Sequence, residues 1–114
     1  MYAWYCRKKL RVLWHNGEKF AAEFKSYAHD DSRRPFRVLV LGDETAVGVG
    51  GTKEESIAAR LGEYVRASVE NYGIMGISTR DVVDQSAKAW RAEYDLALVQ
   101  IGTNDILALT WGSI

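Results

Sequence analysis

The sequence has one cysteine, one proline and two histidines, and its net charge is zero. Several of these features exclude a class of function or site. Its one cysteine, Cys6, cannot form a disulfide within the chain and lacks cysteine or histidine partners at the spacing of a zinc site. Fifteen basic residues balance fifteen acidic ones, which is not the composition of a general nucleic-acid binder. No run approaches the roughly 18 apolar residues of a membrane span. We therefore expect no metal, no other cofactor and no nucleic-acid partner.

The single proline marks a change in the chain. Pro35 restricts Arg34 to extended conformations, and an apolar run follows it, so we place one domain at residues 36–114 and a basic, aromatic leader at residues 1–35. The apolar residues of the leader recur at helical spacing, which predicts helical or irregular structure and no β-strand. Two roles stay open for the leader: packing on the domain, or weak contact with a membrane surface, which aromatic and basic side chains favour.

The chain is organised around the stretch at residues 36–51, FRVLVLGDETAVGVGG. Its apolar run stops at Gly42 and gives way to two acids and a glycine-rich segment, which is how a buried parallel strand ends in a loop. In open α/β sheets, ligands bind at the carboxyl ends of such strands. Asp43, Glu44 and Thr45 are therefore candidate site residues.

Two more strands and two helices are predicted after this loop. The strands are expected at residues 67–72 and 94–101, and the helices are expected to begin near residues 52–54 and 78–79. A strand–helix–strand–helix–strand order with connections of this length implies right-handed crossovers, and so an α/β fold with helices on both faces of a parallel sheet. The residues of the first helix expected to face the sheet are Ile57, Ala58, Leu61, Tyr64 and Val65.

Further polar positions follow the ends of the second and third strands. Gly76 lies in the loop after the second strand, and Asn104 and Asp105 follow the third. Because the carboxyl ends of parallel strands share one edge of a sheet, we expect these residues to gather with Asp43 and Glu44, although they are far apart in the sequence. That edge is the candidate site.

Three segments, in their order and spacing, resemble a known family. VLGDETAVGVG, NYGIMGIST and VQIGTNDIL are similar to the first three sequence blocks of the SGNH, or GDSL, hydrolases, and the resemblance covers about residues 36–109. Members of that family are esterases, lipases, thioesterases and carbohydrate deacetylases. The resemblance implies a flavodoxin-like, three-layer α/β/α parallel sheet, here incomplete with three strands in the order 2-1-3. It also implies a small acyl ester or acylated carbohydrate as ligand, and leaves the location open between the cytoplasm and the envelope of a bacterium.

The resemblance also assigns roles to particular residues. The family's nucleophilic serine falls on Glu44, its backbone oxyanion donor on Gly76 and its side-chain oxyanion donor on Asn104. The family's last block, an Asp followed three places on by a His, has no match, and both histidines, His15 and His29, precede the first strand of the domain. The residues interpreted as supporting the loops are Asp43, Thr45 and Asp105.

Glu44 decides the expected mechanism. Ester hydrolysis of this kind needs a hydroxyl, a nearby imidazole and donors for the oxygen that becomes negative, and only the donors are present. We therefore predict an SGNH-type acyl-ester hydrolase domain in a truncated, inactive form. The alternative is a non-catalytic binding or interaction domain that keeps the hydrolase shell. The Glu44 carboxylate is expected either to accept hydrogen bonds from Gly76 and Asn104 or to be solvated in a surface loop.

The third predicted strand raises a separate question. Related domains have five parallel strands, so this strand would be left as a bare edge that invites pairing. Three explanations stay open. The chain is a fragment of a longer product, or it pairs with another chain or with itself through this edge, or the leader folds back over the exposed side.

Overall fold

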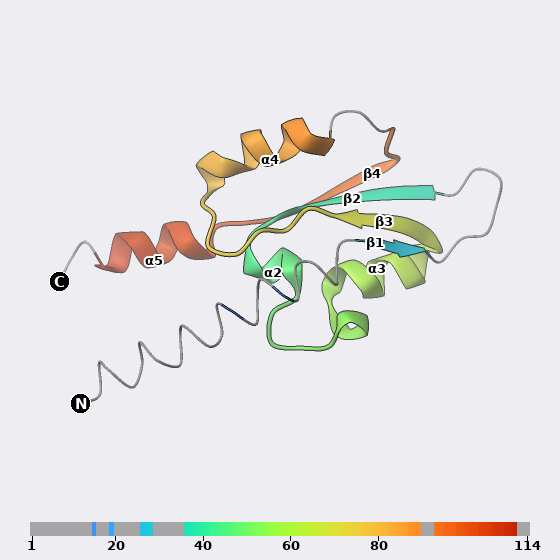
Figure 1. Ribbon diagram of the computed structural model, residues 1–114, viewed down its shortest axis with the longest axis horizontal. Coiled ribbons are helices and arrows are strands. Elements are labelled where there is room, and N and C mark those ends of the chain that lie inside the picture. Colours follow the sequence, from blue (N-terminus) through green and yellow to red (C-terminus); the bar gives the residue numbers. More distant parts are fainter. Residues whose placement is uncertain (1–14, 16–18, 20–25, 29–35, 90–92, 112–114) are drawn as a thin grey trace.

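The structure is a computed structural model that describes residues 15, 19, 26–28, 36–89 and 93–111. Its strands form one sheet in the order β1-β3-β2-β4 (Figure 1). β2 pairs in parallel with β3 on one side and with β4 on the other, while β1 pairs antiparallel with β3. The three parallel strands therefore have the predicted 2-1-3 order. The strand bounds are β1 Ser26–Ala28, β2 Phe36–Gly42, β3 Ala67–Asn71 and β4 Leu96–Gln100.

Helices lie on both faces of this sheet, as predicted. α2 and α3 cover one face and α4 covers the other, while α5 extends from the carboxyl end of β4 (Figure 1). The change of face follows from the topology, because right-handed crossovers that run in opposite directions along a sheet place their helices on opposite sides. The helix bounds are α2 Glu44–Val47, α3 Ile57–Val65, α4 Val82–Ala89 and α5 Thr103–Trp111, and the short 3₁₀ helices are η1 Lys53–Glu55 and η2 Thr79–Asp81.

The core lies between the sheet and α3. Val38 and Val40 of β2 are fully buried and pack with Val69 of β3 and with alanines of α3. The residues of α3 that are buried are small, namely Ala58, Ala59 and Gly62. Small side chains let the helix axis approach the sheet closely, and the larger, partly buried Leu61 and Val65 pack beside them.

The predicted inner face of α3 is partly wrong. Leu61 and Val65 do pack against the core, but Ile57 is 56% exposed and Tyr64 is 87% exposed. Ala58, which was also predicted to face the sheet, is fully buried, and it is joined there by Ala59 and Gly62, which were not predicted. The start of the helix also differs from the prediction: Ser56 caps it by accepting a hydrogen bond from the Ala59 N–H at 3.1 Å.

The leader contributes a strand that the sequence analysis did not expect. Ser26, Tyr27 and Ala28 pair with Glu70, Val69 and Ser68 of β3. The prediction of no strand in the leader is therefore wrong. The reason is that an open edge of β3 offers backbone donors and acceptors to any extended segment. The strand therefore depends on the presence of β3 and not on the sequence of residues 26–28. His15 and Lys19 are helical, and the rest of the expected leader structure, with His29, falls outside the described residues.

β4 is an edge strand in the part of the chain that the structure describes, where it pairs with β2 alone. Leu96 is 40% exposed and Val99 is 51% exposed. The strand of the leader covers the opposite edge of the sheet, beside β3. Among the described residues, no strand pairs with the outer side of the third predicted strand, and β1 lies at the other edge of the sheet.

Candidate functional site

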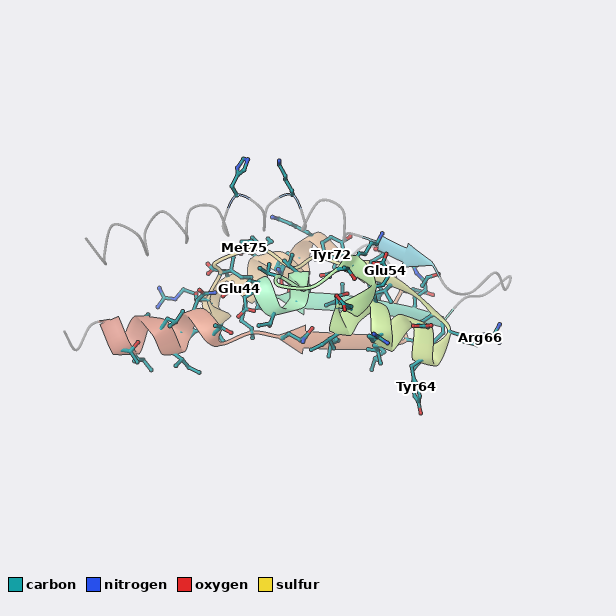
Figure 2. All side chains as sticks on the ribbon, turned by 90° about the horizontal axis from the view of Figure 1, so that it is seen from below. Glu44, Glu54, Tyr64, Arg66, Tyr72 and Met75 are labelled. Atoms are coloured by element: carbon teal, nitrogen blue, oxygen red, sulfur yellow. The ribbon has the colours of Figure 1, made fainter. Side chains whose placement is uncertain are left out.

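The candidate site lies where the order of the sheet reverses. The chain leaves β2, pairs next on one side as β3 and then on the other side as β4, and such a reversal opens a crevice at the carboxyl ends of the strands. α2 begins at Glu44, directly after β2, and α5 begins at Thr103, shortly after β4. Figure 2 shows Glu44 at the start of α2, near α5 and the loop that carries Met75. The three predicted loop tips therefore meet at one edge of the sheet.

Two groups donate hydrogen bonds to the Glu44 carboxylate. The Gly76 backbone N–H lies 3.0 Å from Glu44 Oε2, and the Asn104 side-chain nitrogen Nδ2 lies 3.0 Å from the same oxygen. These donors are 32 and 60 positions away from Glu44 in the sequence. Of the two positions expected for this side chain, the structure shows the hydrogen-bonded one. The carboxylate therefore fills the space between the two donors.

The Asp43 side chain is hydrogen-bonded to the residues that follow β2 and to the start of α5. It is fully buried and accepts hydrogen bonds at Oδ1 from the Thr45 N–H, at 2.9 Å, and from Thr45 Oγ1, at 2.7 Å. Its second oxygen, Oδ2, accepts from the Thr103 N–H at 3.3 Å. A buried carboxylate with three donors is satisfied where it is, and here it connects the start of α2 to the start of α5.

Asn104 and Asp105 also bind the loop that carries Gly76. Asn104 Nδ2 donates to the Ile77 carbonyl at 2.9 Å. The Asp105 carboxylate accepts from the Thr79 N–H and from Thr79 Oγ1, both at 2.9 Å. The first turn of α5 is thus joined by side-chain hydrogen bonds to the segment that follows Gly76.

Two buried amide side chains near the site were not singled out from the sequence. Gln85 of α4 is hydrogen-bonded to both backbone groups of Gly42, and Asn71 donates to the Ala46 carbonyl at 2.7 Å while accepting from the Gly73 N–H at 2.9 Å. The signal for Gln85 was a polar residue at helical spacing from Val82 and Ala89. Such a residue binds backbone groups when it faces the sheet, because a buried amide needs partners.

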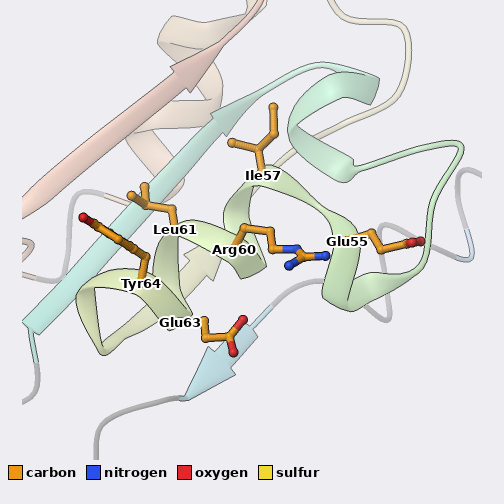
Figure 3. A pocket seen from close by; sticks show the side chains of 6 residues that line it. All are labelled: Glu55, Ile57, Arg60, Leu61, Glu63 and Tyr64. Carbon is orange, nitrogen blue, oxygen red and sulfur yellow. The ribbon is translucent and has the colours of Figure 1, made fainter.

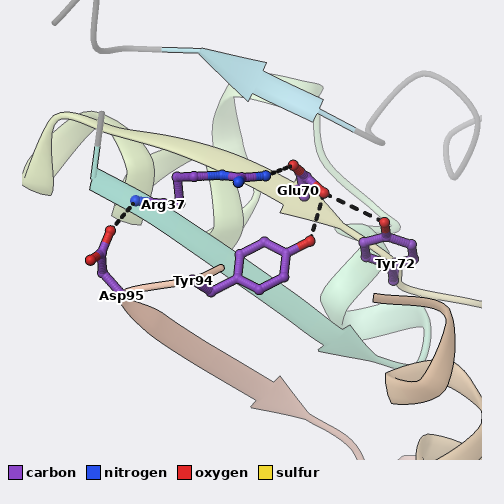
Figure 4. Close-up of polar contacts among 5 residues, drawn as sticks. All are labelled: Arg37, Glu70, Tyr72, Tyr94 and Asp95. Carbon is purple, nitrogen blue, oxygen red and sulfur yellow. Dashed lines mark hydrogen bonds and ion pairs between the residues drawn. The ribbon is translucent and has the colours of Figure 1, made fainter. Parts of the chain in front are cut away.

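A second polar cluster joins the start of β2 and the segment before β4 to the carboxyl half of β3 (Figure 4). Glu70 of β3 accepts hydrogen bonds from the Arg37 guanidinium and the Tyr94 hydroxyl, both at 2.6 Å, and from the Tyr72 hydroxyl at 3.4 Å. Asp95 accepts from the Arg37 N–H at 2.9 Å, and the Arg37 guanidinium carbon lies 5.2 Å from the centre of the Tyr94 ring. The cluster connects β2, β3 and the segment that enters β4.

Glu70 and Tyr94 shift each other's pKa. Burial raises the pKa of Glu70, but the hydrogen bonds from Tyr94 and Arg37 outweigh burial, so the pKa lies below its ordinary value of 4.5. Burial, and then the hydrogen bond to Glu70, raise the pKa of Tyr94 above its ordinary value of 10.0. At pH 7 Glu70 is therefore charged and forms an ion pair with Arg37, while Tyr94 is neutral and donates its hydroxyl proton to Glu70.

A surface pocket of about 640 Å³ runs along α3 and does not include the candidate site (Figure 3). It is open to solvent and its lining mixes charged with apolar side chains: Glu55, Ile57, Arg60, Leu61, Glu63 and Tyr64. Within the described ranges, no three His, Cys, Asp or Glu side chains are grouped so that they could hold a metal ion. No helix among those same residues is long and apolar enough to cross a membrane.

The arrangement of sheet, helices and loop tips can be compared with solved structures. The crystal structure of AlinE4, an SGNH-hydrolase family esterase, matches this chain with a TM-score of 0.58 and 26% sequence identity. The fold is SGNH-hydrolase-like. The match covers 68% of this chain and 46% of the AlinE4 chain, so this chain spans about half the length of that esterase. No protein-family model and no curated protein sequence matches the chain.

Proposed function

We propose that this chain is an SGNH-type ester-hydrolase domain in an inactive form, in which Glu44 occupies the oxyanion pocket formed by Gly76 and Asn104. The observation that supports the proposal is the pair of 3.0 Å hydrogen bonds that meet at one oxygen of the Glu44 carboxylate. In an esterase, donors placed in this way stabilise the negative oxygen of the tetrahedral intermediate. Here the carboxylate takes the place of that oxygen, as the anionic product of ester cleavage would.

The charge of Glu44 opposes catalysis even if a substrate enters. An oxyanion that develops about 4 Å from the carboxylate is repelled by about 4 kcal/mol at an effective dielectric constant of about 20, which slows the reaction roughly a thousandfold. A carboxylate also lacks the proton that a base removes from a serine. The sequence offers no histidine after His29, so no Asp-x-x-His block of this chain supplies an imidazole. These residues support an inactive site.

The test is ester hydrolysis by the full chain and by a Glu44→Ser variant, with p-nitrophenyl acetate as the substrate. We expect neither protein to release p-nitrophenol faster than buffer, because the serine would still lack an imidazole. Glu54→Ser is the matched control, since Glu54 is an exposed glutamate outside the site. Hydrolysis by the native chain that is lost in Glu44→Ser would overturn the proposal.

A non-catalytic binding domain is the second candidate. The contacts of Asn104 with Ile77, and of Asp105 with Thr79, favour it, because they join the two donor segments without the participation of Glu44. Such a domain would hold a small acyl ester or an acylated carbohydrate with the same donors. Binding of an acetylated glucoside to the native chain, measured by calorimetry, supports this candidate. Binding only to Glu44→Ala supports the self-occupied site instead.

A further inference from the structure

We infer that Asp105 is a positioning residue: by binding Thr79, it sets the distance between the two groups that donate to Glu44. This inference rests on the proposed function, because it concerns the same oxyanion pocket. In this inference Asp105 and Asn104 have separate roles. Asn104 supplies a donor, and Asp105 holds the other donor segment in reach.

The hydrogen bonds carry this inference. Asp105 Oδ2 accepts from the Thr79 N–H and Oδ1 accepts from Thr79 Oγ1, both at 2.9 Å and across 26 positions of sequence. Next to Asp105, Asn104 Nδ2 bonds to the Ile77 carbonyl at 2.9 Å. Two adjacent residues of α5 therefore bind the segment that follows Gly76, one at Ile77 and the other at Thr79, where η2 begins. A carboxylate that accepts two bonds from one residue fixes orientation as well as distance.

Local capping does not explain the contact. The turn η2 already has a cap of its own, because Asp81 Oδ2 accepts from the Ser78 N–H and from Ser78 Oγ, both at 2.8 Å. Asp81 lies inside the turn, whereas Asp105 lies on another element. Two carboxylates therefore bind one short turn, and of these two it is Asp105 that links the turn to α5.

The exposure of α5 makes this link important. Ile106 is 65% exposed and Leu107 is 47% exposed, so the apolar side chains of this helix contribute little to its attachment. Its first turn is instead held by polar contacts: the Thr103 N–H bonds to Asp43, Asn104 bonds to Ile77, and Asp105 bonds to Thr79. When the last of these contacts is removed, the loop with Gly76 can move relative to Asn104. Both donors then no longer reach one oxygen.

The experiment uses Glu44 itself as the probe, in the full chain labelled with ¹⁵N. The chemical shifts of the Gly76 amide and the Asn104 side-chain amide are measured in the native protein and in Glu44→Ala, which define the bound and empty pocket. We expect Asp105→Ala to move both signals by more than half of that difference. Asp105→Asn keeps one acceptor oxygen and is expected to move them less. Asp81→Asn, the matched control, is expected to leave them near the native positions.

Each outcome decides something. Unchanged signals in a folded Asp105→Ala, or an equal change in Asp81→Asn, would overturn the positioning role, because the second result would assign the effect to the stability of the turn. Thr79→Val, which removes only the hydroxyl, serves if Asp105→Ala does not fold, and the same signals should move in the same direction by a smaller amount. If Glu44→Ala leaves the Gly76 and Asn104 signals at their native positions, the self-occupied pocket itself fails.

Discussion

Gln85 and Gly42 lie 43 positions apart in the sequence and are joined by a pair of hydrogen bonds. Gln85 Oε1 accepts from the Gly42 N–H at 2.8 Å, and Gln85 Nε2 donates to the Gly42 carbonyl at 3.0 Å and to the Tyr72 carbonyl at 2.6 Å. The side chain of a helix thus pairs with the end of β2 as the backbone of a neighbouring strand would. Because Gly42 directly precedes Asp43, this amide also fixes the base of the candidate site.

Replacing Gln85 by leucine should destabilise the fold. The side chain is 2% exposed, so the Gly42 N–H would lose its partner without access to water. A buried unsatisfied group of this kind costs about 1–3 kcal/mol, and we expect the free energy of unfolding, measured with urea, to fall by about 2–3 kcal/mol. Asp84→Leu, at the neighbouring exposed position, is the control and should change it by about 0.5 kcal/mol or less. Equal effects of the two substitutions would contradict the role given to the amide.

Gly42 itself should tolerate no side chain. Its φ is +144°, and a Cβ built there lies 1.7 Å from the Gln100 carbonyl oxygen of β4. Gly42→Ala therefore has to push β2 and β4 apart, and we expect a loss of about 3 kcal/mol or more in thermal or urea unfolding. Gly50→Ala separates the two causes, because Gly50 has a φ of +105° but open space around it. It should cost only the backbone strain, about 1–2 kcal/mol.

The strand positions were predictable from short-range patterns, and the meeting of the loop tips was predictable from the geometry of parallel strands. An apolar run that ends in Gly42 and two acids marks β2, and parallel strands bring their carboxyl ends to one edge. The hydrogen bonds of Glu44 follow from the same logic, since a carboxylate placed between two donors satisfies them. The chemical roles of Glu44, Gly76 and Asn104 stay predictions.

The features that the sequence did not reveal depend on partners that are distant along the chain. β1 forms because β3 has an open edge, and Ser26, Tyr27 and Ala28 show no strand pattern of their own. α3 turns small residues to the sheet, and its large residues Ile57 and Tyr64 lie outside, because close approach outweighs the burial of single large side chains. Both outcomes are set by tertiary packing, which local propensity does not encode.

Glu70 should make stability depend on pH. Its pKa in the folded protein is below the ordinary value of 4.5, so its contribution is present above that value and is lost as the pH falls through the folded pKa. Glu70→Gln should lower the free energy of unfolding by about 1 kcal/mol at pH 7, because the ion-pair side chains are 35% and 34% exposed and therefore screened. The difference from the native protein should shrink between about pH 5 and pH 3. Glu54→Gln, on the surface, should show no such difference, and a gap that persists at pH 3 would exclude this explanation.

The edge of β4 should pair with a second copy of the chain. The Asp43 N–H donates to the Gln100 carbonyl on the β2 side, and residues alternate in a parallel ladder, so Leu96 and Leu98 bond to β2 while Ala97 and Val99 turn their backbone groups to the open side. β4, with the sequence LALVQ, carries no charge. An antiparallel pair of two such strands therefore places no like charges opposite one another, and a two-fold axis satisfies both edges at once.

We expect the molar mass from size-exclusion chromatography with light scattering to rise with protein concentration towards that of a dimer. Val99→Lys places a charge on the edge strand, at a side chain that is 51% exposed, and should return the protein to a monomer. Val83→Lys is the matched control, because Val83 is 71% exposed but belongs to α4 and not to the edge strand, and it should leave the association unchanged. A native chain that stays monomeric at every concentration would show that the polar backbone of β4 is satisfied by water alone. The exposed apolar side chains beside the strand would then need another explanation than self-association.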